Sequence, residues 1–137
     1  MKRLVIQARM PGLNEIINAR RRKFANGKMD GYNLLKKKWS QVILICARTQ
    51  GFECRGGGHF TYVFREANKT RDPSNIAAGA IKLIEDGLQD AGLLENDGWK
   101  HIKSIHTLLL TSEKPSVTLY VTDEKPTEKE VQQWTMN

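Results

Sequence analysis

The sequence has little cysteine and no long apolar run, and each shortage excludes a class of protein. Its two cysteines, Cys46 and Cys54, are too few for a disulfide framework and lack the paired spacing of a zinc site. The longest apolar stretches, 42–47 and 108–110, are far shorter than the roughly 20 residues of a membrane span. The first residues lead straight into mixed sequence rather than an export signal. We therefore expect no membrane partner, reduced thiols and a cytoplasmic location.

Charge is present in quantity, and it is divided unequally along the chain. Residues 1–71 carry 16 Lys and Arg against four Asp and Glu, a net charge of +12. Residues 72–137 carry six against 11, a net charge of −5, so the whole chain has a charge of +7. This division suggests a surface for a polyanion beside a group of carboxylates, although charges spread over solvated faces explain it equally well.

Hydrophobic periodicity predicts the main elements of the fold. Alternating apolar residues predict strands at 2–9, around 60–64, at 101–110 and at 117–121. Spacings of three and four predict helices over 32–49 and from about 72 to 91. Residues 13–30 read as a loop with a short helix and are a candidate contact arm, and the segment from Asp123 onward reads as a solvated or frayed terminus.

The order and length of these elements predict a single α+β domain. A chain of 137 residues is long enough for one compact domain and too short for two domains of ordinary size. We expect a mixed sheet of about four strands packed with two main helices. The domain should cover residues 1–123, followed by a charged C-terminal tail at 124–137.

The second predicted helix carries polar residues that suggest chemistry on phosphate esters. Asn75, Gly79, Lys82 and Asp86 recur along one stripe of this helix, and Asp72 lies at its start. Asp97 follows in the next loop. Phosphodiester hydrolysis commonly uses carboxylates that hold a divalent cation, and a lysine beside them can stabilise the charge on the phosphate.

Each of these residues also has a purely structural interpretation. Asp72 before Pro73 is a good helix cap. Lys82 and Asp86 have the spacing of an exposed ion pair on one helix face. Asp97 is followed by glycine, which is a common turn dipeptide.

The combination nevertheless resembles a known family. The pattern consists of Arg71-Asp72-Pro73-Ser74-Asn75-Ile76, then Lys82 and Asp86, then Asp90-Ala91-Gly92-Leu93-Leu94-Glu95-Asn96-Asp97-Gly98-Trp99. It is similar to the signature of the RusA family of Holliday junction resolvases, which has an Asp-x-Asp-Asn motif opening a helix, a lysine and an acid along it, and an acidic turn after Ala-Gly. Pro11-Gly12-Leu13-Asn14 also resembles the family's loop after its first strand. About 30 residues carry the strong match.

The resemblance implies a RusA-like fold and a homodimeric endonuclease that depends on Mg²⁺. Such enzymes make paired nicks in four-way DNA junctions during recombination and repair, and phages or prophages often encode them. Matched position by position, Asp72, Lys82 and Asp97 are the implied catalytic residues. Asp72 and Asp97 are the implied metal ligands, and we expect Asp86 to join them.

One departure from the family pattern weakens the implied metal site. Where the family has its second acid, this chain has Ser74, which offers a cation only a hydroxyl oxygen. The loss of one carboxylate should weaken Mg²⁺ binding unless Asp86 or Glu95 compensates. The alternative function is therefore a non-catalytic protein that binds branched DNA.

The basic first half supplies the residues expected to contact DNA. They are Asn14, Arg20, Arg21, Arg22, Lys23, Lys36, Lys37, Lys38, Arg71 and Asn75. Contacts between these cations and phosphates release counterions, so salt should weaken binding strongly. A single-strand or RNA-binding module would instead need surface aromatics among the basic residues, and Trp39 falls on the apolar helical stripe.

Overall fold

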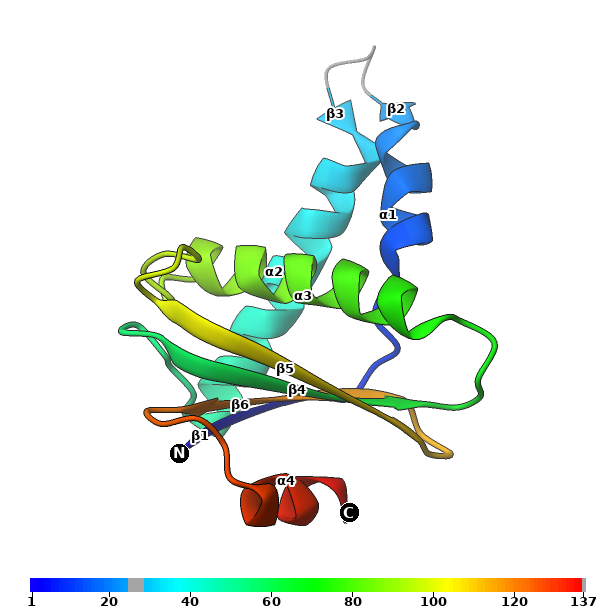
Figure 1. The fold of residues 1–137 in the computed structure, drawn as a ribbon. Coiled ribbons are helices and arrows are strands. Elements are labelled where there is room, and N and C mark those ends of the chain that lie inside the picture. The colour runs from blue at the N-terminus through cyan, green and yellow to red at the C-terminus, as the bar shows by residue number, and fades with distance from the viewer. Residues whose placement is uncertain (25–28, 137) are drawn as a thin grey trace.

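The structure is a computed structural model that describes residues 1–24 and 29–136; the side chains of residues 23, 24, 29 and 30 are outside that description. Its described elements form a four-stranded mixed sheet with helices on both faces (Figure 1). The sheet order is β1 (Lys2–Ile6), β6 (Ser116–Thr122), β4 (Gly58–Glu66) and β5 (Ile102–Thr111). β4 runs parallel to β5, whereas the other neighbouring pairs are antiparallel.

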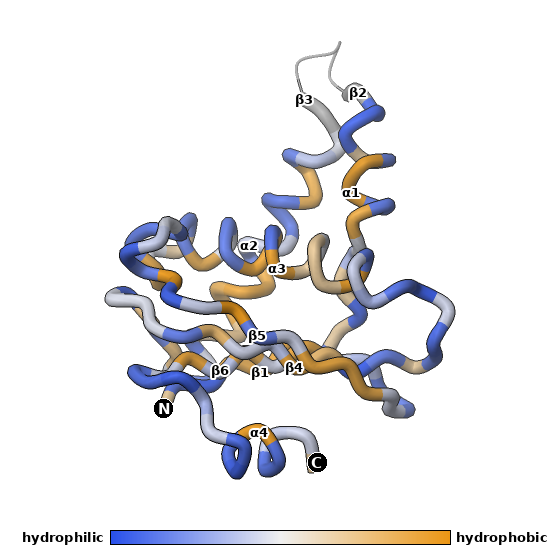
Figure 2. The backbone as a smooth tube through the Cα atoms, viewed as in Figure 1, coloured by the Kyte–Doolittle hydropathy of each residue, from blue (hydrophilic) through white to orange (hydrophobic). Residues whose placement is uncertain are grey.

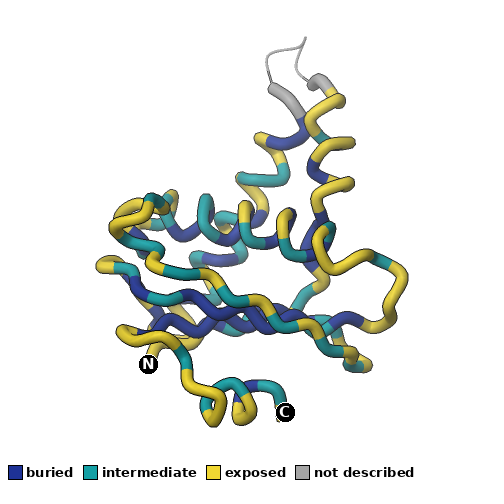
Figure 3. The backbone as a smooth tube through the Cα atoms, in the orientation of Figure 1, coloured by how far each residue is buried: buried dark blue, intermediate teal, exposed yellow. Residues whose placement is uncertain are grey.

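The core lies between this sheet and two long helices, α2 (Gly31–Gln50) and α3 (Pro73–Asp90). Apolar residues recur among polar ones along both helices (Figure 2), as the predicted spacings of three and four require. On the sheet, Phe60, Tyr62 and Phe64 alternate along β4 and are fully buried against the helices. The buried residues gather in the central strands (Figure 3). The predicted α+β class, the mixed sheet and the two main helices are therefore confirmed.

A basic arm projects from the helical layer, away from the sheet (Figure 1). It consists of α1 (Leu13–Arg20), the short strands β2 (Lys23–Phe24) and β3 (Met29–Asp30), and the first turns of α2. The backbone N–H of Gly31 donates to the carbonyl of Arg22 at 2.9 Å, which ties the two helices together at the tip. The predicted short helix in the contact arm is thus α1.

The prediction of a solvated or frayed terminus is wrong. Glu128–Thr135 form a helix, α4, that begins with a capping box between Thr127 and Glu130 and lies on the outer face of the sheet. Trp134 is buried because its ring stacks on Tyr120 with 4.2 Å between ring centroids. Arg65 also donates to the Trp134 carbonyl at 2.9 Å. Within the described residues, no helix has both the length and the apolar character that a membrane crossing requires.

Candidate functional site

Asp72 lies in a groove between the start of α3 and the end of β5. We call this the Asp72 groove; it has a volume of about 480 Å³ and is lined by Glu66, Asn68, Lys69, Arg71, Asp72, Pro73, Ile76, Leu109, Leu110 and Thr111. Asp72 occupies the N-cap position, but its side chain makes no capping hydrogen bond. Its exposed carboxylate has no partner within the described part of the chain. It is therefore free to bind a cation.

Arg71, predicted to contact DNA, instead holds this end of the domain together. Its guanidinium donates twice to the Glu66 carboxylate, at 2.7 and 3.0 Å, and also to Glu15 at 3.1 Å and to the Met10 carbonyl at 2.9 Å. The Arg71 side chain is only 10% exposed. These contacts occupy its guanidinium and leave it little capacity for a phosphate, and its assignment to the DNA surface stays a prediction.

The first half of the polar stripe on α3 is used to pack α1. The Asn75 side-chain oxygen accepts from the backbone N–H of Asn14 at 2.8 Å, at the start of α1. A Cβ at Gly79 would come within 2.3 Å of the Gly12 carbonyl carbon, so only glycine allows the two backbones to approach this closely. The Asn75 oxygen, predicted to contact DNA, is thus used within the protein, while the Asn14 side chain remains exposed.

The second half of the stripe contacts α2. Asp86 accepts a hydrogen bond from the Tyr32 hydroxyl at 2.7 Å through one oxygen, and its other oxygen lies 3.3 Å from the Lys82 ammonium. The Asp86 side chain is 12% exposed, whereas that of Lys82 is 53% exposed. The ion pair that the spacing of Lys82 and Asp86 suggests is therefore formed, and both Asp86 oxygens already have partners.

The acid that the sequence did not single out is Glu85. It lines a hollow of about 350 Å³ at the other end of α3, which we call the Asp97 hollow: Glu85, Asp97, Gly98, Trp99, Ile102, Lys103, Ser104 and Ile105. Tyr62, fully buried in the core, donates to Glu85 at 3.1 Å. Burial raises the pKa of Glu85 to about 7, and the charges of Asp97 and Asp86 add to the rise. Its position between Ile81 and Leu88 on the helix was the available signal for its burial.

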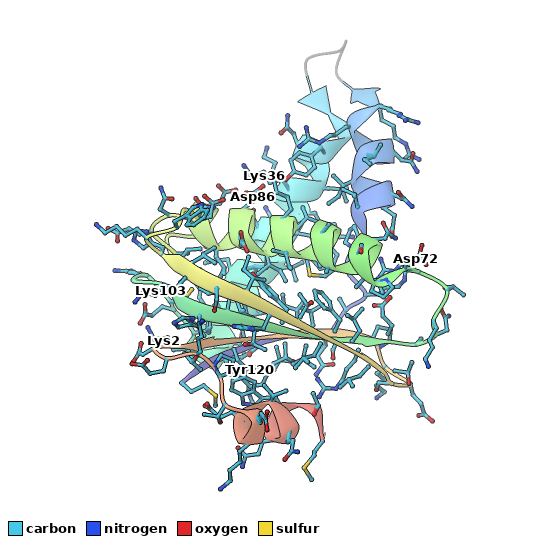
Figure 4. All side chains as sticks on the ribbon, in the orientation of Figure 1. Lys2, Lys36, Asp72, Asp86, Lys103 and Tyr120 are labelled. Atoms are coloured by element: carbon cyan, nitrogen blue, oxygen red, sulfur yellow. The ribbon has the colours of Figure 1, made fainter. Side chains whose placement is uncertain are left out.

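The three predicted metal ligands do not form one site within a single chain. Asp72 and Asp86 lie toward opposite ends of α3 (Figure 4), and 14 helical residues correspond to roughly 21 Å. Within the described residues, no three side chains among His, Cys, Asp and Glu come close enough to hold an ion. As a set contributed by one chain, Asp72, Asp86 and Asp97 do not fit a Mg²⁺ ion.

The predicted basic residues lie along the basic arm, and their side chains differ in the contacts that hold them. Arg20 stacks 4.4 Å above the Tyr32 ring, and Lys38 lies 5.3 Å from the Trp39 ring centre. Arg22 and Lys38 border a cleft of about 460 Å³ between α1 and α2. Lys36 lies 4.0 Å from Asp90. Arg21 and Lys37 are exposed, and the Lys23 side chain is outside the described part.

The Asp72 groove and the Asp97 hollow thus lie at opposite ends of β5, which is an edge strand of the sheet. The Asp97 hollow lies at its first residues and the Asp72 groove at its last. In the comparisons with known proteins, no protein-family model matches the chain, and no curated protein matches it either.

Proposed function

We propose that this protein is a structure-selective DNA endonuclease that acts on four-way junctions as a homodimer and requires Mg²⁺. The observation that carries the proposal is the position of two carboxylates, Asp72 and Asp97, at opposite ends of one edge strand, where neither has a partner among the described residues. A single chain leaves each of them in an incomplete site. Two chains related by a twofold axis across that strand would complete both sites.

The edge of β5 has the features of a pairing surface. An edge strand presents unpaired backbone donors and acceptors to a second chain. Its apolar residues Ile105 and Leu109 are 48% and 36% exposed, and Trp99, just before the strand, is 96% exposed. Apolar side chains along an open edge favour coverage by another protein surface.

Antiparallel pairing of two β5 strands would bring complementary half-sites together. In a twofold interface, the start of one strand lies beside the end of its partner. The Asp97 hollow of one chain would then adjoin the Asp72 groove of the other. Each of the two sites would contain Asp72 from one chain with Asp97 and Glu85 from its partner.

This composite site has the donor chemistry that a divalent cation prefers. Carboxylate oxygens are the usual ligands of Mg²⁺ in proteins. When bound, the ion supplies charge neutralisation and an activated water for phosphodiester hydrolysis. Lys82 is exposed on α3, but its ion pair with Asp86 would have to break before its ammonium could reach a phosphate.

The basic arm supports DNA as the partner. Arg20, Arg21, Arg22, Lys36, Lys37 and Lys38 lie on it, and two copies would present two such arms to the four strands of a junction. Their contacts to phosphates would be sequence-independent and sensitive to salt. This arrangement fits recognition of DNA shape rather than of base sequence.

The test is cleavage of a labelled four-way junction against a matched duplex, with Mg²⁺ or with a chelator. We expect symmetric nicks in the junction that require the cation and are lost in Asp72→Asn and in Asp97→Asn. Asp123→Asn, in the exposed loop before α4, changes the charge equally and should cleave normally.

Ser74 favours a second candidate function. Its neutral side chain is exposed beside Asp72, where the family pattern has an acid, so each composite site has one carboxylate fewer. A protein with this scaffold could bind branched DNA without cutting it. Tight, salt-sensitive junction binding with no cleavage at any Mg²⁺ concentration would contradict the nuclease proposal and support this one.

A further inference from the structure

The outer face of the sheet carries a second polar hollow, on the side opposite α3. Its volume is about 260 Å³, and the residues lining it are Arg3, Val5, Gln7, Arg65, Ser112, Lys114, Ser116, Thr118 and Tyr120. We call it the outer hollow. Three of these residues are cations and none is a carboxylate. This charge balance distinguishes it from the Asp72 groove and the Asp97 hollow.

The strand register explains how these side chains come together. Ser116, Thr118 and Tyr120 alternate along β6 and form the floor, with Tyr120 extending toward α4 (Figure 4). Arg3 on β1 lies opposite Tyr120, and Arg65 on β4 lies opposite Ser116. Cations from both neighbouring strands therefore flank a floor of hydroxyl groups.

The hydrogen-bonding groups of the outer hollow are largely unused. Within the described residues, Arg3, Arg65 and Lys114 make no ion pair, and the only hydrogen bond of the Arg65 side chain goes to the Trp134 carbonyl of α4. That bond fixes the guanidinium and leaves its other N–H groups free. The Thr118 hydroxyl likewise has no partner in the described part of the chain, although Thr118 is only 4% exposed.

We infer that the outer hollow binds a phosphate group. A fixed guanidinium, an ammonium and hydroxyl donors around a space without carboxylates match the charge and acceptor geometry of that oxyanion. No carboxylate among the lining residues offsets the charge of the three cations, and a bound anion would do so. The phosphate can belong to a DNA backbone or to a small phosphorylated molecule. The inference is independent of the proposed nuclease, because none of these residues lies at Asp72 or Asp97.

The first experiment titrates the protein with inorganic phosphate and follows backbone amide resonances by NMR. We expect the largest shifts at Arg65, Ser116 and Thr118. Binding should weaken roughly ten- to a hundred-fold in Thr118→Val, since the loss of one hydrogen bond to a charged ligand has about that effect. The double variant Arg3→Gln/Lys114→Gln should bind more weakly still. Lys125→Gln/Lys129→Gln removes the same charge from exposed positions before and within the first turn of α4, and should bind as the wild type does.

The second experiment identifies the source of the phosphate. The affinity for a fluorescent duplex is measured over a range of salt concentrations for the same four proteins. If the DNA backbone supplies the phosphate, Arg3→Gln/Lys114→Gln lowers the slope of log K against log salt by about one to two relative to its control. If only inorganic phosphate binding falls, a small phosphorylated ligand is the source. Equal phosphate and DNA binding by this double variant and its control, or phosphate-induced shifts elsewhere in the protein, would overturn the inference.

Discussion

The two ends of α3 hold their acidic side chains in opposite ways. At the first end, Asp72 has a free carboxylate, while its neighbour Arg71 is fixed by Glu66 and Glu15. At the second end, Asp86 is occupied by Tyr32 and Lys82, whereas Asp97 in the following loop has no partner among the described residues. Packing therefore leaves one unpartnered candidate ligand at each end. A shared helix stripe in the sequence does not imply a shared site.

The largest expected effect comes from mixing two inactive variants. If each site takes Asp72 from one chain and Asp97 from its partner, Asp72→Asn and Asp97→Asn should each lower junction cleavage by a hundred-fold or more. A mixed dimer of the two variants retains one intact site. We therefore expect the mixture to recover nicking of one strand per junction, measured on a denaturing gel.

The matching control is the double variant Asp72→Asn/Asp97→Asn, in which both chains of the dimer carry both substitutions. It should remain inactive, because no pairing restores a complete site. If the mixture of single variants also stays inactive while mixed dimers are detected by mass spectrometry, the two half-sites do not combine across chains.

The second prediction concerns the rigidity of the Asp72 end. Arg71→Ala would leave the buried Glu66 carboxylate and the Met10 carbonyl without their partner, and should lower the free energy of unfolding by about 3 kcal/mol. Urea denaturation followed by fluorescence measures this loss. Lys69→Ala, at an exposed position in the same loop, should change it by less than about 0.5 kcal/mol. Equal stability of the two variants would mean that the Arg71 contacts do not hold this end.

The third prediction tests the edge strand that joins the two ends. Ile105 is 48% exposed, so Ile105→Arg should leave the isolated chain folded. In a dimer it would bury two uncompensated charges, and we expect dimer dissociation to increase at least ten-fold, roughly 1.4 kcal/mol. Sedimentation velocity measures the change. Leu34→Arg, at a similarly exposed position on α2, is the control and should dimerise normally.

The elements with strong periodicity could be predicted from the sequence, whereas α4 could not. The apolar spacing in α3 and the alternation in β4 are long enough to identify both elements. In α4, only Val131 and Trp134 are apolar on a short charged segment. Its stability depends on contacts with the outer face of the sheet, including Tyr120 and Arg65, which no local pattern reveals.

The candidate site was predictable in its residue types but not in its partners. The helical spacing correctly places Lys82 beside Asp86. It cannot show that Tyr32, 54 residues away in the chain, occupies the second Asp86 oxygen. Nor does the sequence show that the Arg71 guanidinium contacts the Met10 carbonyl and the Glu15 carboxylate. Tertiary contacts decide which polar side chains remain free.

The last prediction concerns Glu85, at the second end of α3. Burial raises the pKa of Glu85 from 4.5 to about 7, so the folded chain holds this proton more tightly than the unfolded chain does. The free energy of unfolding therefore falls as the pH rises from about 4.5 through about 7. After allowance for partial solvent exposure, Glu85 should account for about 1–2 kcal/mol of this fall. Urea denaturation at pH 5.5 and pH 8 should show that amount missing in Glu85→Gln and present in Glu113→Gln, which changes an exposed acid in the β5–β6 turn. An identical pH dependence in both variants would show that Glu85 is ionised in the folded protein at pH 5.5 and that its burial does not control its charge.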